Sequence, residues 1–436
     1  MADRSDSARP AWRPTRARLA PAILALVVAG CGVGPTPAPT ATPAPTPTAR
    51  TSERPTGTPR PPTEVLLAEI RVAVSGIRGI EPSGDVEPVI IDEATLRANL
   101  ESEFDAESPP AELAIVEDVY EALGLLPAGA SLRALSLDLL AGQVAGYYSP
   151  ERDELFVVSR SGVVGPVELA TYAHEFTHQL QDQRFDLDGL GLDATDQGDR
   201  ALAVLALIEG DATAAQSAWL QGGALTPEEL GEIFQASLDP AGLEALRRAP
   251  AILRETTLFP YRDGSAFVID LLFQGGYPAV DAAYASPPQS TEQVLHPEKY
   301  AMGEAPLDIG VPAGLAAHLG AGWTEAARDT LGELILRIWL REGGLEAADS
   351  RAAAAGWGGD RLVLLRGPGG QLAIALLSEW DSAADAAEFG AAANAAIAGL
   401  GLSGVVVQES GSASVGLAIG DRAVDLAAAL RAGAAE

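Results

Sequence analysis

His174-Glu175-Phe176-Thr177-His178 is the stretch on which the interpretation of this chain depends. On a helix, two histidines four residues apart project from one face and can bind the same metal ion. Glu175 lies about 100° further round the helix, beside such an ion rather than on it. With four histidines in 436 residues, this pattern arises by chance in roughly one chain in several hundred. A metal site is therefore the leading interpretation.

The residues around this motif predict a helix over 166–183. Pro166 suits the first helical position and Glu168 suits the first turn. Apolar residues recur at helical spacing, so we expect the helix to be half buried. Upstream, residues 146–149 and 154–159 flank a polar turn and predict a β-hairpin. A strand beside such a helix can hold an extended peptide by strand addition.

A catalytic zinc site needs a third protein ligand and an open position for water. Eight apolar residues, 201–208, are followed directly by Glu209. A carboxylate at the end of a buried helical segment is costly unless it is paired or bound to a metal. We therefore expect Glu209 to be the third ligand. The alternative is that the helix predicted over 200–221 simply becomes exposed at this point.

The two residues that follow Glu209 support the site less directly. Asp211 is a candidate hydrogen-bond partner for a ligand histidine, whose tautomer it would fix. Its position about 200° round the helix from Glu209 is unfavourable for this contact, and an exposed aspartate is an equal alternative. Gly210 weakens a helix by about 1 kcal/mol relative to alanine. A close approach of this helix to the histidine helix would explain its presence.

The chain resembles the gluzincins, zinc metallopeptidases of zincin-like fold that carry an HExxH helix and a downstream glutamate ligand. It is more closely similar to a group of largely uncharacterised bacterial lipoprotein metallopeptidases, from about residue 65 to near the C-terminus. The matching segments are 146–148, 174–187, 207–212, 290–300 and 356–361. One departure is Thr213, because many gluzincins have an aspartate four residues after the glutamate ligand.

The resemblance implies an α+β fold with a zincin-like metallopeptidase core that is largely helical and has a small antiparallel sheet. It implies one Zn2+ per chain, held by His174, His178 and Glu209, and a peptide or protein substrate. In the implied mechanism zinc activates a water molecule. Glu175 is the general base that takes the proton from this water and returns it to the leaving amine.

Hydrolysis of this kind also needs a group that stabilises the tetrahedral oxyanion. His296 is our catalytic candidate, because two of the other histidines are expected ligands and His318 lies in an ordinary Ala/Leu stretch. Tyr300 and Tyr261 are alternative donors. The remaining alternative is a structural role for His296 in its loop.

The first 30 residues have the pattern of a leader peptide. Five arginines precede an apolar stretch over 19–29, which is too short to span a bilayer comfortably. The stretch ends at Val28-Ala29-Gly30-Cys31, which resembles a bacterial lipobox, and Cys31 is the only cysteine. We predict a lipoprotein signal peptide over 1–30 and lipidation of Cys31. Ordinary secretory cleavage that leaves a free thiol is the alternative.

This leader predicts a protein anchored by lipid to the cell membrane, on its extracytoplasmic side. Residues 31–63 form a Pro/Thr-rich linker, expected to be extended, which would hold the folded part away from the membrane. The formal net charge of −31 makes nucleic acid and anionic lipid surfaces poor partners. We therefore expect no nucleic-acid partner and a membrane contact through the lipid anchor.

The folded part is expected to divide where glycine and proline cluster, near residues 305–322. This gives a catalytic domain over 64–310 and a small C-terminal α+β region over 311–436. Further helices are predicted over 111–126, 132–144, 264–273, 324–341 and 382–398, with a last helix at the C-terminus. Further strands are predicted over 86–91, 361–366, 372–377 and 404–408.

Two other functions remain open. One is a binding or assembly lipoprotein whose zinc site has no catalytic role, although Glu175 argues against it because a structural site has no use for that residue. The other is a zinc amidase that acts on cell-wall material rather than on proteins. A cleavage screen separates the amidase from the peptidase.

Overall fold

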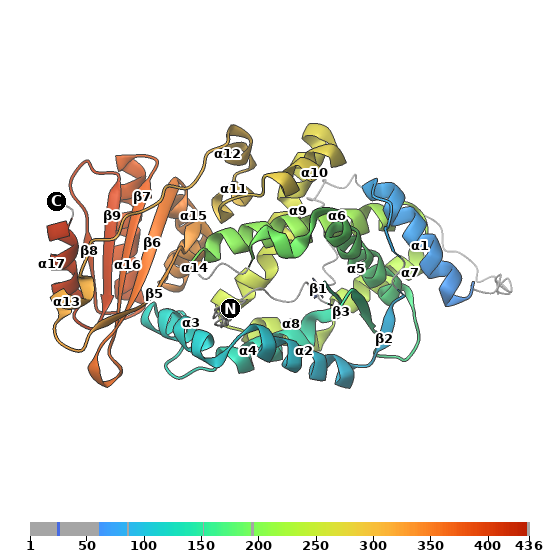
Figure 1. The fold of residues 1–436 in the computed structure, drawn as a ribbon, viewed down its shortest axis with the longest axis horizontal. Helices are drawn as coiled ribbons and strands as arrows, with labels where there is room; N and C mark the ends of the chain where they lie inside the picture. Colours follow the sequence, from blue (N-terminus) through green and yellow to red (C-terminus); the bar gives the residue numbers. More distant parts are fainter. Residues whose placement is uncertain (1–23, 27–60, 85–86, 151, 193–195, 434–436) are drawn as a thin grey trace, which may run out of the picture.

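The computed structural model of the protein describes residues 24–26, 61–84, 87–150, 152–192 and 196–433. Cys31 and most of the predicted leader and linker lie outside the described residues. Within them, a mainly helical region and a C-terminal region built on a five-stranded sheet lie side by side along the long axis of the molecule (Figure 1). The chain is thus a mixed α+β protein with a large helical part, as the sequence predicts.

The helical region contains one small sheet. After β1 (Leu24–Leu26), its elements are α1 (Thr63–Arg78), β2 (Val89–Ile91), α2 (Glu93–Glu107), α3 (Pro110–Ala122), α4 (Leu132–Gln143), β3 (Val144–Ser149), β4 (Glu154–Val158), α5 (Pro166–Phe185) and α6 (Gly198–Gln221). They continue with α7 (Pro227–Ser237), α8 (Pro240–Arg248), α9 (Ala251–Gly275), α10 (Tyr277–Ala285), α11 (Thr291–Leu295) and α12 (Pro297–Met302). A 3-10 turn, Leu187–Leu190, lies between α5 and α6.

The small sheet has the strand order β1-β3-β4-β2. The predicted hairpin is confirmed, because β3 and β4 pair antiparallel with Tyr147 opposite Phe156. The two rings stack with their centroids 4.6 Å apart, which fixes the register on this face. β1 pairs antiparallel with the other edge of β3, and β2 pairs in parallel with β4. β3 therefore lies inside the sheet, and both it and β4 contact α5.

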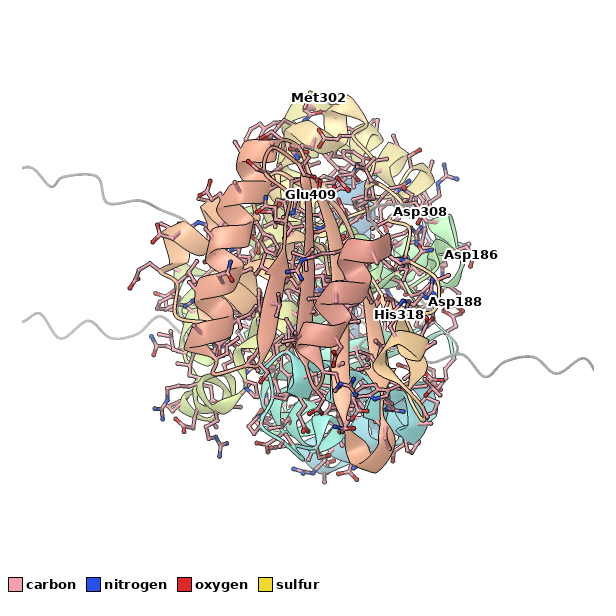
Figure 2. The ribbon with its side chains drawn as sticks, turned by 90° about the vertical axis from the view of Figure 1, so that its left-hand side faces the viewer. Asp186, Asp188, Met302, Asp308, His318 and Glu409 are labelled. Carbon is pink, nitrogen blue, oxygen red and sulfur yellow. The ribbon has the colours of Figure 1, made fainter. Side chains whose placement is uncertain are left out.

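The C-terminal region is a helix-covered antiparallel sheet. Its elements are α13 (Leu315–Leu319), β5 (Thr324–Asp329), α14 (Gly332–Glu342), α15 (Ala347–Ala354), β6 (Trp357–Arg366), β7 (Leu372–Trp380), α16 (Ala383–Gly399), β8 (Gly404–Val407), β9 (Ser414–Gly420) and α17 (Ala423–Gly433). The strand order is β5-β6-β7-β9-β8. Alternate residues of each strand point to opposite faces. One face packs against α14 and α16, and the other against α13 and α17, so both are buried (Figure 2).

One prediction for the C-terminal region was wrong, and one strand was missed. The helix predicted over 324–341 is strand β5 followed by α14, because residues 324–329 pair with β6. Gly332, where α14 begins, has a φ of 73°, so the helical backbone does not continue back through it. Strand β9 was not predicted. Its sequence, Ser-Val-Gly-Leu-Ala-Ile-Gly, is rich in small residues, which lowers its strand propensity.

The two regions share one hydrophobic core. A single cluster of buried apolar side chains extends from Leu207 of α6 and Phe267 of α9 through Trp339 of α14 to Leu364 of β6. The indole nitrogen of Trp339 also donates a hydrogen bond to the carbonyl of Leu123, at 3.0 Å. The residues on either side of position 310 therefore pack as one body. None of the helices in the described part of the chain has the length and apolar character that a membrane crossing requires.

Candidate metal centre

The histidine motif lies on α5, which runs through the middle of the helical region. Pro166 occupies its first position, and the carboxylate of Glu168 accepts a hydrogen bond from the backbone N–H of Gly165 at 2.9 Å. The helix ends at Asp186, whose φ of 55° is the left-handed conformation found at many helix ends. Every residue over 169–181 is buried. The expectation of a half-buried helix was therefore wrong, because α1, α6, α7 and the hairpin surround α5.

Three candidate ligands converge between α5 and α6. The Nε2 atoms of His174 and His178 lie 3.1 Å apart, and Oε2 of Glu209 lies 3.2 Å from the first and 3.4 Å from the second. Tetrahedral zinc with ligands at about 2.0–2.1 Å requires ligand atoms about 3.3–3.4 Å apart. The three atoms thus have the spacing of three corners of a zinc site.

The protonation states of these side chains also suit a metal. Burial lowers the pKa of His174, which favours its neutral form. Burial alone would raise the pKa of Glu209, but the two neighbouring histidines, His178 and His174, lower it to about 2. Glu209 is therefore a carboxylate at neutral pH. Metal binding needs neutral histidine and ionised glutamate, so the pKa shifts of His174 and Glu209 both favour the form that binds a metal.

Glu175 is fully buried next to the ligand histidines, on the side of α5 that faces β3. A Cβ atom on Gly146 of β3 would lie 3.3 Å from Cγ of Glu175 and 2.5 Å from Cγ2 of Thr171. Only a glycine lets the strand come this close to the helix. Gly146 therefore sets the distance between Glu175 and the backbone of β3.

The predicted role of Asp211 needs correction. Asp211 is fully buried, which excludes the exposed alternative, but its carboxylate accepts hydrogen bonds from Arg78, Gln181 and Tyr284 rather than from either candidate ligand histidine. Its Oδ2 accepts a hydrogen bond from Gln181 Nε2 at 2.9 Å, and Gln181 Oε1 lies 2.8 Å from Nδ1 of His178. The helical angle between Asp211 and Glu209 explains this, because it turns the aspartate away from the ligand face.

His296 does not join the cluster in the structure. Its Nε2 lies 3.0 Å from Oε2 of Glu333, and its Nδ1 lies 3.9 Å from Glu298. The hydrogen bond with Glu333 raises the pKa of His296. Within the described part of the chain, no hydrogen bond or ion pair links His296 to the three ligand residues. These contacts match the alternative of a structural loop histidine, held by a carboxylate on α14.

Of the other candidates, one lies beside the site and two lie elsewhere. The ring of Tyr261 on α9 stacks on that of His174, with centroids 6.2 Å apart and planes 30° apart. Tyr300 donates its hydroxyl hydrogen to the carbonyl of Ser286 at 2.9 Å. His318 is exposed on α13, at the surface of the C-terminal region (Figure 2).

Glu209 lies on α6, and residues distant in the sequence hold the N-terminus of this helix. The backbone N–H of Gly198 donates to Asp329 at 2.8 Å, and that of Thr291 donates to the buried carboxylate of Asp199 at 3.1 Å. Gly332 lies directly against Asp199, since a Cβ there would be 1.7 Å from its Oδ1. The C-terminal region therefore fixes the start of the helix that supplies the third candidate ligand.

Sequence reasoning missed two residues of this neighbourhood. Gln181 follows His178 by three positions, a spacing that places two side chains on one helix face and would have identified it. Arg78 binds Asp211 from 133 positions away in the sequence, with Nε 3.1 Å from Oδ2. No local pattern predicts that contact.

Comparison with known proteins adds a partial match. Residues 319–431 match the model of a domain of unknown function (DUF8575). The matched segment starts at the end of α13 and covers the five-stranded sheet and its helices, but it contains none of the three candidate ligands. No curated protein and no solved structure matches the chain.

Proposed function

We propose that this protein is a zinc-dependent metallopeptidase with Glu175 as its general base. The observation that carries the proposal is the triangle of ligand atoms from His174, His178 and Glu209, whose sides suit tetrahedral zinc. Two imidazole nitrogens and one carboxylate form a donor set that favours zinc. When bound, zinc supplies a Lewis acid and lowers the pKa of water towards 7.

The composition of the site supports catalysis over a structural role. Structural zinc sites usually have four protein ligands, whereas catalytic sites have three and an open position. Among the described residues, no fourth histidine, cysteine, aspartate or glutamate joins the group of His174, His178 and Glu209. Glu175 follows the first ligand and has the position of a base that takes a proton from water and returns it to the leaving amine.

The small sheet supports a peptide substrate. The outer edge of β3 pairs antiparallel with Leu24–Leu26, a segment of the predicted leader. Removal of the leader would leave that edge open to another extended chain, which would bind by main-chain hydrogen bonds. Because Gly146 holds β3 against Glu175, a peptide bound there would run past the general base.

Tyr261 replaces His296 as the proposed oxyanion donor. Its ring stacks on that of His174, whereas His296 is paired with Glu333. A phenol hydroxyl can donate a hydrogen bond to an oxygen that gains negative charge in the transition state. We also retain the proposal that the enzyme is attached to the cell membrane through lipid on Cys31, facing the extracytoplasmic side.

The first experiment is elemental analysis of the full chain, purified in detergent without chelators. The expected result is one zinc per chain, and loss of that zinc in Glu209→Ala. Absence of zinc after reconstitution would overturn the proposal. Metal retained by Glu209→Ala would remove Glu209 from the ligand set.

The second experiment is a cleavage screen on a peptide library derived from a proteome. The expected result is cleavage by the zinc-loaded protein and a rate at least about a hundredfold lower for Glu175→Gln, which loses the base but keeps the ligands. Equal rates would exclude Glu175 as the base. Cleavage of cell-wall fragments without any peptide product would replace the peptidase with an amidase.

A further inference from the structure

Gln181 is a buried glutamine whose amide orientation can be deduced from its surroundings. Its Nε2 lies 2.9 Å from Oδ2 of Asp211 and 3.0 Å from the carbonyl oxygen of Ile208. A carbonyl oxygen can only accept, and an ionised carboxylate can only accept, so the atom between them must be the NH2 group. Oε1 of Gln181 therefore faces His178.

This orientation determines the tautomer of His178. Nδ1 of His178 lies 2.8 Å from Oε1 of Gln181, which has no hydrogen to give. Nδ1 must therefore carry the hydrogen and donate it. In the neutral ring the lone pair then belongs to Nε2, which is the atom that lies beside His174 and Glu209.

Asp211, which orients Gln181, is itself held by two other elements. Nε of Arg78 on α1 lies 2.8 Å from its Oδ1, and the hydroxyl of Tyr284 on α10 donates to its Oδ2 at 3.0 Å. The side chains of Arg78 and Asp211 are both fully buried. Arg78 is fixed further by an ion pair with Asp281 at 2.8 Å. The carboxylate thus has little freedom to turn away from Gln181.

We propose that Arg78, Asp211 and Gln181 form a positioning relay that keeps His178 in the Nδ1–H tautomer and points its Nε2 at the metal. None of the three touches the metal or the substrate, so they act only through His178. The inference rests on the proposed zinc site. A purely structural role, in which Gln181 only ties α5 to α6, is the alternative that the experiment must exclude.

The chain contains a matched control for that alternative. Gln216 is also buried and also joins α5 to α6, because its Nε2 donates to the carbonyl of Ala170 at 2.8 Å. It contacts no ligand histidine in the described structure. Replacing either glutamine with methionine removes a bond between the same two helices, but only Gln181→Met removes the acceptor for His178.

Two measurements on the full chain test the relay. Long-range ¹H–¹⁵N spectra of the metal-free protein, which has four histidines, are recorded at a pH where the imidazole rings are neutral. They should show His178 as the Nδ1–H tautomer in the wild type and as a mixture in Gln181→Met. Zinc affinity, from competition with a chromogenic chelator, should fall by about 10–100-fold in Gln181→Met. It should stay within about twofold in Gln216→Met, with melting temperatures lowered in both.

The outcomes separate the relay from the proposed function. An Nε2–H tautomer in the wild type, or an unchanged tautomer and zinc affinity in Gln181→Met, would overturn the relay. The expected tautomers without any zinc binding would overturn the metallopeptidase and leave the relay as a device that orients the ring. Tyr284→Phe, which removes a single donor to Asp211, provides a milder variant if Gln181→Met fails to fold; it should shift both readouts in the same direction.

Discussion

Gly210 of α6 and Gly264 of α9 lie in direct backbone contact where the two helices cross. A Cβ on Gly210 would lie 2.3 Å from the carbonyl oxygen of Gly264, and a Cβ on Gly264 would lie 2.2 Å from the carbonyl oxygen of Ala206. Gly210 thus does allow a close approach of helices, but the partner is α9 and not the histidine helix α5 that the sequence suggested. Glu209 precedes this contact directly, and Tyr261 lies one turn before Gly264, so the crossing of α6 and α9 fixes these two residues relative to each other.

Gly210→Ala should therefore disturb both the fold and the candidate metal centre. Because backbone atoms of α9 occupy the space of the new methyl group, the helices must separate, at a cost on the order of 2 kcal/mol. Urea unfolding of the metal-free protein and a zinc titration should show lower stability and weaker binding. Gly231→Ala on α7 is the control, since no atom lies within 4 Å of its Cβ position. A Gly210→Ala protein as stable as this control would contradict the prediction.

Tyr261→Phe should lower kcat about a hundredfold, as expected for the loss of one oxyanion donor. The zinc content should stay the same, because the phenyl ring still stacks on His174. His296→Asn should instead lower the melting temperature with little change in kcat, since it breaks the contact with Glu333. Steady-state kinetics on one peptide substrate measures both effects. The reverse pattern would restore His296 to the catalytic role.

The stability of the protein should fall as the pH rises from 5 to 8. Burial raises the pKa of Glu292 to about 7 and the pKa values of Asp329 and Asp360 to about 6. The folded state thus binds these protons more tightly than the unfolded chain, whose carboxyl pKa values are near 4. The stabilisation is complete below about pH 4 and is lost as the pH rises through 6–7. Urea unfolding at each pH tests this, and Glu292→Gln should flatten the curve.

Lys299 is the only lysine in the chain, and its replacement by arginine should lower the stability of the protein. Its Nζ lies 2.6 Å from Glu292, 2.9 Å from Glu304 and 2.7 Å from Asp381. A compact ammonium can point its three hydrogens at three carboxylates, whereas a planar guanidinium cannot. Lys299→Arg should cost about 1 kcal/mol. Lys299→Met leaves the three acids unpaired and should cost about 2–3 kcal/mol. This is less than for a fully buried pair, because the carboxylates of Glu304 and Asp381 reach solvent. Equal unfolding midpoints for all three proteins would contradict this.

The parts of the structure that follow from local spacing could be predicted. The histidine helix, the hairpin before it and the helix with Glu209 each have a pattern within about 20 residues, and each was confirmed as an element. That the three candidate ligands meet also follows, because a buried glutamate after an apolar helix needs a partner. The function of the assembled site stays a prediction.

The remaining features depend on contacts between distant residues. Strand β5 exists because it pairs with β6, and its own sequence, Thr-Glu-Ala-Ala-Arg-Asp, suits a helix equally well. The partners of Asp211 come from α1, α5 and α10. The pairing of His296 with Glu333 joins residues 37 positions apart. None of these contacts leaves a period or motif in the sequence.

The core shared by the two regions has a thermodynamic consequence. Because Trp339 and Leu207 belong to one buried cluster, the five-stranded sheet and helices α5 and α6 should unfold in a single cooperative transition. A ligand that binds only the native state stabilises everything that unfolds with its site. Zinc bound between α5 and α6 should therefore delay the melting of the sheet. Part of the thermal stability of the segment that matches a domain of unknown function would then depend on a metal bound outside that segment.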